Sequence, residues 1–234
     1  MAPSHVSPEL VALRPYLDDR LGTIGLQLSE AQTEGLLLFV ASLQHWNQTH
    51  NLTAVREMPA LIETHLVDSL LAVPRLFSAV DGPVGPLLDV GSGAGAPALP
   101  WALALPSVRI DLVEKVAKKV AFLRHAVSRL GLQDRVKIHP VEVQTLQGGA
   151  SYDMIVSRAF ASLPRFLSLT EHLSRVGTRW VYMAGRLSQV EGLDSNNSMY
   201  THPSFGSSIV LERIDTLSDP PQKERHLIWL RRDA

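Results

Sequence analysis

The segment Leu87-Leu88-Asp89-Val90-Gly91-Ser92-Gly93-Ala94-Gly95-Ala96 is the most informative part of the sequence, because an apolar run leads directly into a glycine-rich turn and then into a helix-like stretch. A strand that ends in closely spaced glycines is typical of the nucleotide-binding turn of α/β proteins. Glycine lets the chain reverse sharply and lets a ligand approach the backbone, while the next helix presents free N–H groups. The pattern predicts a cofactor site at this turn.

Short apolar runs around this segment alternate with helix-like patterns, which is the signature of strand–helix–strand units and a mainly parallel sheet. The apolar runs predict strands at 86–90, 108–113, 135–139, 152–156, 178–183, 207–213 and 226–231, with a helix between the second and third and a loop at 192–205. The turn-like Ser218-Asp219-Pro220-Pro221 joins the last two strands, so we expect them to pair as an antiparallel edge. The fold class is therefore α/β, with a Rossmann-like, mainly parallel seven-stranded sheet.

Residues 1–80 have a different texture and predict helices. Ser29 and Gln32 have the spacing of a capping box, and apolar residues at helical spacing follow as far as Trp46. A second apolar stripe runs from Pro59 to Pro74. We expect an N-terminal helical segment at 1–80, followed by a cofactor-binding domain at 81–234.

Composition restricts the possible functions of the chain. The sequence has no cysteine, which excludes disulfides and thiol chemistry, and its nine histidines are scattered, so we expect no metal. A net charge of −1 argues against a protein that coats nucleic acid with its whole surface. No apolar run approaches the roughly 18 residues that span a bilayer, and the N-terminus lacks a secretory pattern, so we expect a cytoplasmic protein.

A second feature supports a cofactor with an adenosine group. Glu114 follows Gly91 by 23 residues at the end of the next predicted strand, where a carboxylate accepts hydrogen bonds from both ribose hydroxyls. The spacing Gly91-x-Gly93-x-x-Ala96 also fits the dinucleotide fingerprint, so NAD is an alternative. Asp89 favours S-adenosylmethionine, because its carboxylate suits a sulfonium and an amino group better than a pyrophosphate. The cofactor contacts expected in this region are Asp89, Gly91, Ser92, Gly93, Gly95, Ala96 and Glu114.

Several separated segments then resemble one family, the bacterial 16S ribosomal RNA methyltransferase G family, once called glucose-inhibited division protein B. Its members are S-adenosylmethionine-dependent class I methyltransferases that methylate N7 of one guanine in the small-subunit RNA. The segments are Trp46-Asn47, Asn51-Leu52-Thr53, His65-Leu66-Val67-Asp68-Ser69-Leu70, the glycine turn, Lys119-Val120-Ala121-Phe122-Leu123-Arg124, Ser157-Arg158-Ala159-Phe160-Ala161-Ser162-Leu163 and Glu224-Arg225-His226-Leu227. They occur in family order from about residue 36 to 230.

The resemblance implies the activity and further site residues. It implies cofactor contacts at Val143, Gln144 and Arg158 in addition to Gly91 and Ala96, and catalytic roles for Arg158 and Arg225. Arg158 would hold the methionine carboxylate or a nucleotide phosphate through its planar fork, and Arg225 would hold RNA phosphates. The implied partner is 16S ribosomal RNA or the 30S particle, and we expect a monomer that produces 7-methylguanosine.

His65, Asp68 and Ser69 share a helix face, and we interpret them as a capping or inter-segment hydrogen-bond network rather than as catalytic groups. The chain also departs from the family pattern, with Ala184 where a lysine is usual and Glu142 where a basic residue is usual. Three hypotheses stay open: the ribosomal RNA methyltransferase, a class I methyltransferase with another substrate, and a non-catalytic or NAD-binding Rossmann module.

Overall fold

The structure of the protein, a computed structural model, describes residues 8–78, 85–147, 152–190, 209–219 and 223–233. Helices precede the sheet, as predicted. The N-terminal elements are α1 (Pro8–Ala12), α2 (Arg14–Thr23), α3 (Glu30–His50), α4 (Met58–Leu61), the π-helix η1 (Ile62–Val67), α5 (Asp68–Leu70) and α6 (Val73–Ser78). The remaining elements are β1 (Leu87–Val90), α7 (Ala98–Ala104), β2 (Ile110–Val113), α8 (Ala117–Arg129), β3 (Val136–His139), η2 (Val143–Thr145), β4 (Met154–Arg158), α9 (Leu163–Thr170), η3 (Glu171–Leu173), β5 (Arg179–Ala184), η4 (Leu187–Gln189), β6 (Ile209–Asp219) and β7 (Lys223–Arg232).

The seven strands form one sheet in the order β3-β2-β1-β4-β5-β7-β6. The first five strands of this order run parallel to one another, and β7 is antiparallel to both β5 and β6. The predicted fold class is therefore confirmed. Strand order reverses at β1, whose neighbours are β2 and β4, and in open α/β sheets such a reversal creates a crevice at the carboxyl ends of the strands.

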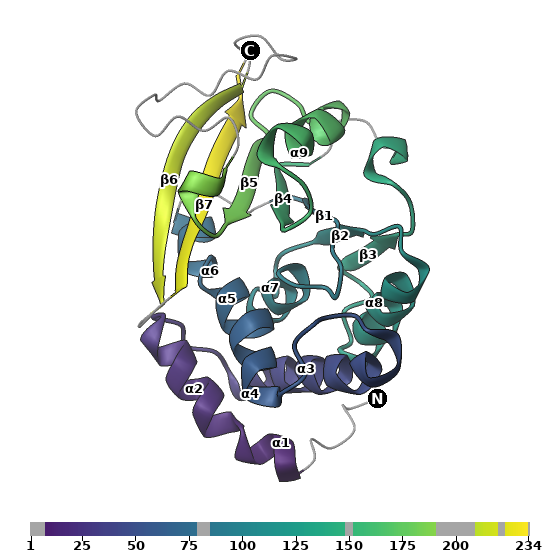
Figure 1. Cartoon of the computed structure of the whole chain (residues 1–234), viewed down its shortest axis with the longest axis vertical. Coiled ribbons are helices and arrows are strands. Elements are labelled where there is room, and N and C mark those ends of the chain that lie inside the picture. Colours follow the sequence, from purple (N-terminus) through teal and green to yellow (C-terminus); the bar gives the residue numbers. More distant parts are fainter. Residues whose placement is uncertain (1–7, 79–84, 148–151, 191–208, 220–222, 234) are drawn as a thin grey trace.

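Helices cover both faces of the sheet (Figure 1). One face carries the larger hydrophobic core, to which α3, α7 and α8 contribute Phe39, Trp101 and Phe122. The other face packs against α9 through Phe166, with Trp180 of β5 in the same core. Residues from the N-terminal helices and from the sheet share the larger core, so the helices of the predicted 1–80 segment pack directly on the predicted 81–234 domain.

The N-terminal helices follow the predicted pattern with one correction. Ser29 caps α3 as predicted: its backbone N–H donates to Gln32 Oε1 at 2.8 Å, and its Oγ accepts from the Gln32 N–H at 3.4 Å. The second predicted helix, 59–74, is not one regular helix, because a π-helix interrupts it and α6 begins at Val73. Pro74 thus lies in the first turn of α6, where a missing N–H costs nothing.

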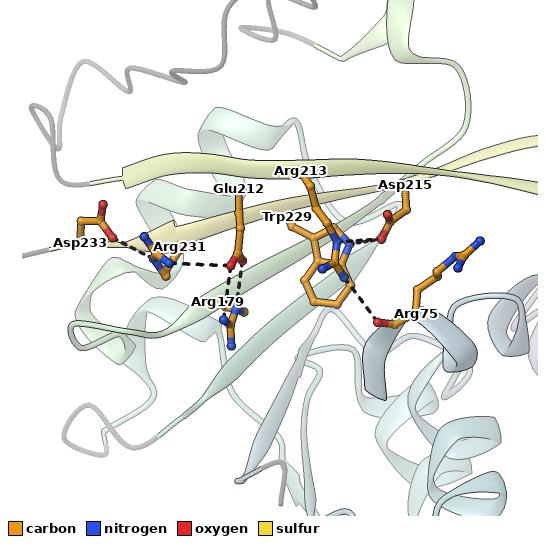
Figure 2. Close-up of polar contacts among 8 residues, drawn as sticks. All are labelled: Arg75, Arg179, Glu212, Arg213, Asp215, Trp229, Arg231 and Asp233. Atoms are coloured by element: carbon orange, nitrogen blue, oxygen red, sulfur yellow. Dashed lines mark hydrogen bonds and ion pairs between the residues drawn. The ribbon is translucent and has the colours of Figure 1, made fainter. Parts of the chain in front are cut away.

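The antiparallel edge is longer than the apolar runs predicted. Strand β6 continues through Ser218 and Asp219, which pair with β7, so these two residues are not part of the predicted turn. Residues 220–222 and the predicted loop 192–205 lie outside the described residues. Polar contacts support this edge (Figure 2): Arg213 lies 4.2 Å from the ring centroid of Trp229, and Asp215 accepts from both side chains. Apolar periodicity therefore does not reveal the second half of β6, which contains polar and charged residues.

None of the described helices has the length and the apolar composition needed to span a lipid bilayer.

Candidate active site

Two adjoining cavities lie at the carboxyl ends of the parallel strands. The first has a volume of about 600 Å³, and we call it the arginine cavity; its lining includes Thr53, His65, Asp68, Arg158, Tyr182 and Arg225. The second has a volume of about 700 Å³, and we call it the carboxylate cavity; its lining includes Glu114, Val143, Gln144, Phe160 and Arg165. Both cavities are also lined by Gly91, Lys119 and Ala159, so they meet at the glycine turn. This is the size and position expected for a small-molecule site.

The glycine turn adopts a backbone that ordinary residues avoid. Gly91, Gly93 and Gly95 have φ of +70°, +57° and +84°. A Cβ on Gly91 would lie 2.3 Å from Phe160 Cδ2, and one on Gly95 would lie 2.5 Å from Leu99 Cδ1. The two glycines therefore serve different contacts: Gly91 lets Phe160 pack against the turn where the cavities meet, whereas Gly95 lets the turn pack on the core.

Asp89 lies beneath this turn with an unsatisfied carboxylate oxygen. Its side chain is buried, and Oδ2 has no hydrogen-bond partner among the described residues. Burial raises the pKa of the Asp89 carboxyl to about 7. A buried oxygen without a partner is costly, so its position directly before the glycine turn points to a ligand with a hydrogen-bond donor or a positive charge.

Glu114 is fixed at the opposite side of the turn. Its Oε2 accepts the Gly93 N–H at 3.0 Å, and its Oε1 accepts the Val116 N–H at 2.9 Å. The Lys119 ammonium lies 3.9 Å from the same carboxylate. Each carboxylate oxygen retains acceptor capacity after one hydrogen bond, so a rigid Glu114 is available to the two hydroxyls of a ribose.

Three charged side chains meet in the arginine cavity. Arg158, at the end of β4, donates through Nη1 to Asp68 Oδ2 and to the Thr64 carbonyl, both at 2.9 Å. Arg225, from β7, donates through Nε to Asp68 Oδ1. Asp68 comes from α5, directly after the π-helix, and its side chain is 8% exposed. The group therefore connects the N-terminal helices to two strands of the sheet.

His65 belongs to an inter-segment network of the kind predicted for this helix face. Its Nε2 lies 3.1 Å from Thr53 Oγ1, while Asn47 holds the Thr53 N–H at 2.9 Å. Ser69 donates to the His65 carbonyl, and Trp101 donates to the Ser69 carbonyl. Burial, with the nearby charge of Arg158, lowers the pKa of His65 to about 4, so this imidazole is neutral at pH 7.

Most of the predicted site residues line the two cavities. The arginine cavity contains Gly91, Ser92, Gly93, Ala96, Arg158 and Arg225, and the carboxylate cavity contains Gly91, Glu114, Val143 and Gln144. Two predicted contacts, Asp89 and Gly95, line neither cavity in the described part of the chain; Asp89 lies below the turn, and Gly95 faces Leu99 and Leu123. Direct cofactor contact by Gly95 thus has no support from this geometry.

The sequence reasoning assigned no site role to Lys119, Phe160, Tyr182 or Arg186, which also line the cavities. The sequence could have indicated Lys119, since this residue lies in the first turn of the helix that follows Glu114. No sequence pattern indicates Tyr182, because the position of this residue depends on the packing of β5. Its hydroxyl donates to the Ala161 carbonyl at 2.9 Å and so supports the loop after β4. Ala159 in that loop has a φ of +54°, an uncommon conformation for a residue with a Cβ.

Several basic side chains around α8 and near the C-terminus pair with other groups of the protein. Lys118 Nζ donates to the His50 carbonyl at 2.8 Å and caps the end of α3, while Lys115 pairs with Glu142 at 3.0 Å. Near the C-terminus, Arg231 pairs with Asp233, and Arg232 donates to Ser174 Oγ. Glu142 therefore neutralises a lysine at the rim of the carboxylate cavity.

Comparisons with known proteins agree on one family. The family model described as rRNA small subunit methyltransferase G matches residues 32–218. The chain is 36% identical to a ribosomal RNA small subunit methyltransferase G of Nitrosospira multiformis over 217 residues, 92% of this chain and 96% of that protein. It is 40% identical to the protein of the same name from Chromobacterium violaceum over 169 residues, 72% of this chain and 78% of the other.

Solved structures share the fold at low sequence identity. The apo form of an S-adenosylmethionine-dependent methyltransferase, SibL, superposes with a TM-score of 0.53 at 16% identity, covering 96% of this chain and 76% of that one. The N-methyltransferase NodS of Bradyrhizobium japonicum superposes with a TM-score of 0.51 at 13% identity, covering 71% of this chain and 94% of that one.

Proposed function

Because the chain belongs to the rRNA small subunit methyltransferase G family, we propose that it transfers the methyl group of S-adenosylmethionine to N7 of one guanine in 16S ribosomal RNA. It is an S-adenosylmethionine-dependent methyltransferase by family. The observation that carries the proposal is the junction of the two cavities at Gly91, beside the unsatisfied carboxylate of Asp89 and the fixed carboxylate of Glu114.

The residues present fit the cofactor. Glu114 would accept the ribose hydroxyls, and Val143 and Gln144 would contact the adenine in the carboxylate cavity. The rest of the cofactor would lie against the glycine turn, in contact with Gly91, Ser92, Gly93 and Ala96. The positively charged amino group of the methionine portion would be the hydrogen-bond partner that Asp89 Oδ2 lacks among the described residues. Arg158 would hold the methionine carboxylate.

The arginine cavity would receive the guanine, because it adjoins the cofactor site and is lined by both polar and apolar groups. The bound cofactor supplies an electrophilic methyl group on a sulfonium. Guanine N7 carries an available lone pair, so the protein has no proton to remove and acts by aligning N7 with the methyl group. A neutral His65 adds no positive charge to the cavity in which the guanine ring gains positive charge on methylation.

RNA would approach over the mouth of the arginine cavity. Arg225 and the exposed Arg186 lie there, and their guanidinium groups are suited to phosphates. We propose 16S RNA, alone or in the 30S particle, as the partner of a monomeric cytoplasmic enzyme that uses no metal. The 1–80 segment would form the wall of the cavity that the RNA meets, since Thr53, His65 and Asp68 belong to it.

Two assays test this proposal. S-adenosylmethionine should raise the melting temperature of the protein and NAD should not; the reverse result would favour the NAD-binding module. Label from S-adenosylmethionine should then appear in 16S RNA or in 30S particles that lack the modification. Cofactor binding without labelling of either substrate would favour a methyltransferase with another substrate, in line with the losses of positive charge at Ala184 and Glu142.

The ionisation of Asp89 predicts how cofactor binding depends on pH. In the unfolded chain the Asp89 carboxyl ionises near its ordinary pKa of 3.8, whereas in the fold it keeps its proton up to about pH 7. Its burial therefore lowers the stability of the free protein as pH rises from about 4 to 7. A cationic ligand favours the ionised form, so affinity should increase as pH rises towards 7, by at most about tenfold per pH unit for one proton.

We expect calorimetry with S-adenosylhomocysteine to show this increase between pH 5.5 and 8 for the native protein and a nearly flat profile for Asp89→Asn. An unchanged pH profile in the variant would contradict the role of Asp89 as the partner of the amino group.

A further inference from the structure

Asp68 occupies an unusual position, because its two carboxylate oxygens hold two different arginines. Oδ2 accepts from Arg158 at 2.9 Å and Oδ1 accepts from Arg225, and these arginines come from β4 and β7. The Asp68 side chain is 8% exposed, compared with 18% for Arg158 and 29% for Arg225. The carboxylate thus lies at the bottom of the group, and the arginines lie nearer to solvent.

The Arg158 guanidinium keeps donors for an anionic ligand. The group is only partly exposed, and charges interact more strongly in such a site than in water. Arg158 uses only Nη1 for Asp68 and the Thr64 carbonyl; its Nε and Nη2 have no partner among the described residues. Asp68 therefore orients Arg158 and leaves most of its planar fork available to a ligand.

The π-helix η1 determines where Asp68 lies. It spans Ile62–Val67 directly before Asp68, and it also supplies the Thr64 carbonyl that accepts from Arg158. One irregular helical segment thus provides both acceptors for the same guanidinium. Wider helical turns of this kind are rare and are found frequently at functional sites.

We propose that Asp68 is a positioning residue that holds the cofactor-side arginine, Arg158, and the RNA-side arginine, Arg225, in one fixed arrangement. This inference rests on the proposed function, because it takes the carboxylate of the cofactor as the ligand of Arg158 and an RNA phosphate as the ligand of Arg225. It follows that one substitution at Asp68 weakens both binding steps, because it acts through the two arginines.

A purely structural role would make Asp68 a tie between helices and sheet, and the chain offers a matched control for that role. Glu212 of β6 also lies between two arginines, at 3.0 Å from Arg179 Nε and 3.8 Å from Arg231 Nη1 (Figure 2). Its side chain is 24% exposed, and it lines neither cavity of the described site. Glu212→Gln therefore removes a carboxylate shared by two arginines without touching the candidate site.

The experiment compares Asp68→Asn, Asp68→Glu and Glu212→Gln. We expect Asp68→Asn to raise the Kd for S-adenosylhomocysteine and the KM for RNA by about tenfold each, with a smaller change in kcat. Glu212→Gln should lower the melting temperature and leave both affinities within about twofold of the native values. Asp68→Glu keeps the charge and should recover part of both losses. If Asp68→Asn fails to fold, Asp68→Glu, which keeps the charge but moves the carboxylate, should still weaken both affinities, whereas Glu212→Gln should not.

A double-mutant cycle tests whether Asp68 acts through its arginines. In an Arg225→Gln background, Asp68→Asn should raise the KM for RNA by only about twofold, because the arginine that it positions is absent. Additive effects, or affinities no more sensitive to Asp68→Asn than to Glu212→Gln, would overturn the proposal. S-adenosylhomocysteine binding requires no RNA, so it tests the role of Asp68 separately from the proposed substrate. If Asp68→Asn weakens this binding but the native protein methylates no RNA, the proposed substrate is contradicted and the positioning role of Asp68 still holds.

Discussion

Gly91→Ala should lower cofactor affinity by at least about 100-fold, roughly 2.7 kcal/mol of binding free energy. Its Cβ would lie 2.3 Å from Phe160 Cδ2 and 3.1 Å from Phe160 Cβ, so rotation of the phenyl ring alone does not relieve the contact. Movement of Phe160 displaces the loop after β4, which lines both cavities. Calorimetry with S-adenosylhomocysteine measures the loss of affinity.

Gly131→Ala is the matched control for backbone strain. Gly131 has a φ of +67°, close to the +70° of Gly91, but a Cβ on it would meet no atom within 4 Å. Both variants should lose about 1–2 kcal/mol of stability from the left-handed backbone, whereas only Gly91→Ala should lose cofactor affinity. Equal affinities in the two variants would show that the space at Gly91 is not part of the cofactor site.

Arg158→Ala should reduce kcat/KM for methyl transfer by about 10²- to 10³-fold, corresponding to roughly 3–4 kcal/mol. The substitution removes the group that we assign to the methionine carboxylate, and it leaves Asp68 with Arg225 as its remaining ion-pair partner among the described residues. Removing one member of a largely buried ion pair also costs stability. Steady-state kinetics, with the melting temperature measured in parallel, separates the two effects.

Arg158→Lys provides the comparison. It keeps the positive charge beside Asp68 but loses the planar fork, so stability should recover more than activity does. A lysine variant with native kcat/KM would contradict a role that depends on the geometry of the guanidinium group.

Local patterns were sufficient to predict the sheet and the cofactor turn. Each parallel strand is a short apolar run beside a helix-like pattern, and Gly91 and Glu114 lie at the ends of neighbouring strands, so their proximity follows from the fold class. The same reasoning places Arg158 at the end of β4. These contacts depend on the succession of strands along the chain and on residue type, both of which the sequence displays.

The remaining features depend on contacts between distant segments. The pairing of Asp68 with Arg158 and Arg225 joins residues 90 and 157 positions apart, and no local periodicity reveals it. The π-helix before Asp68 likewise has the apolar spacing of an ordinary helix, and its backbone carbonyl at Thr64 is used by a strand residue. The sequence reasoning correctly favoured a hydrogen-bond network for His65, but it did not identify the charged group around Asp68.

The identity of the methylated nucleoside tests the proposed reaction. Unmodified 16S RNA, alone or in 30S particles, is incubated with the native protein and labelled S-adenosylmethionine, then digested to nucleosides and separated. Our account predicts about one methyl group per RNA molecule, all of it as 7-methylguanosine, and little label with Arg158→Ala. Label in another nucleoside, or no label in either substrate from a protein that binds the cofactor, would contradict it.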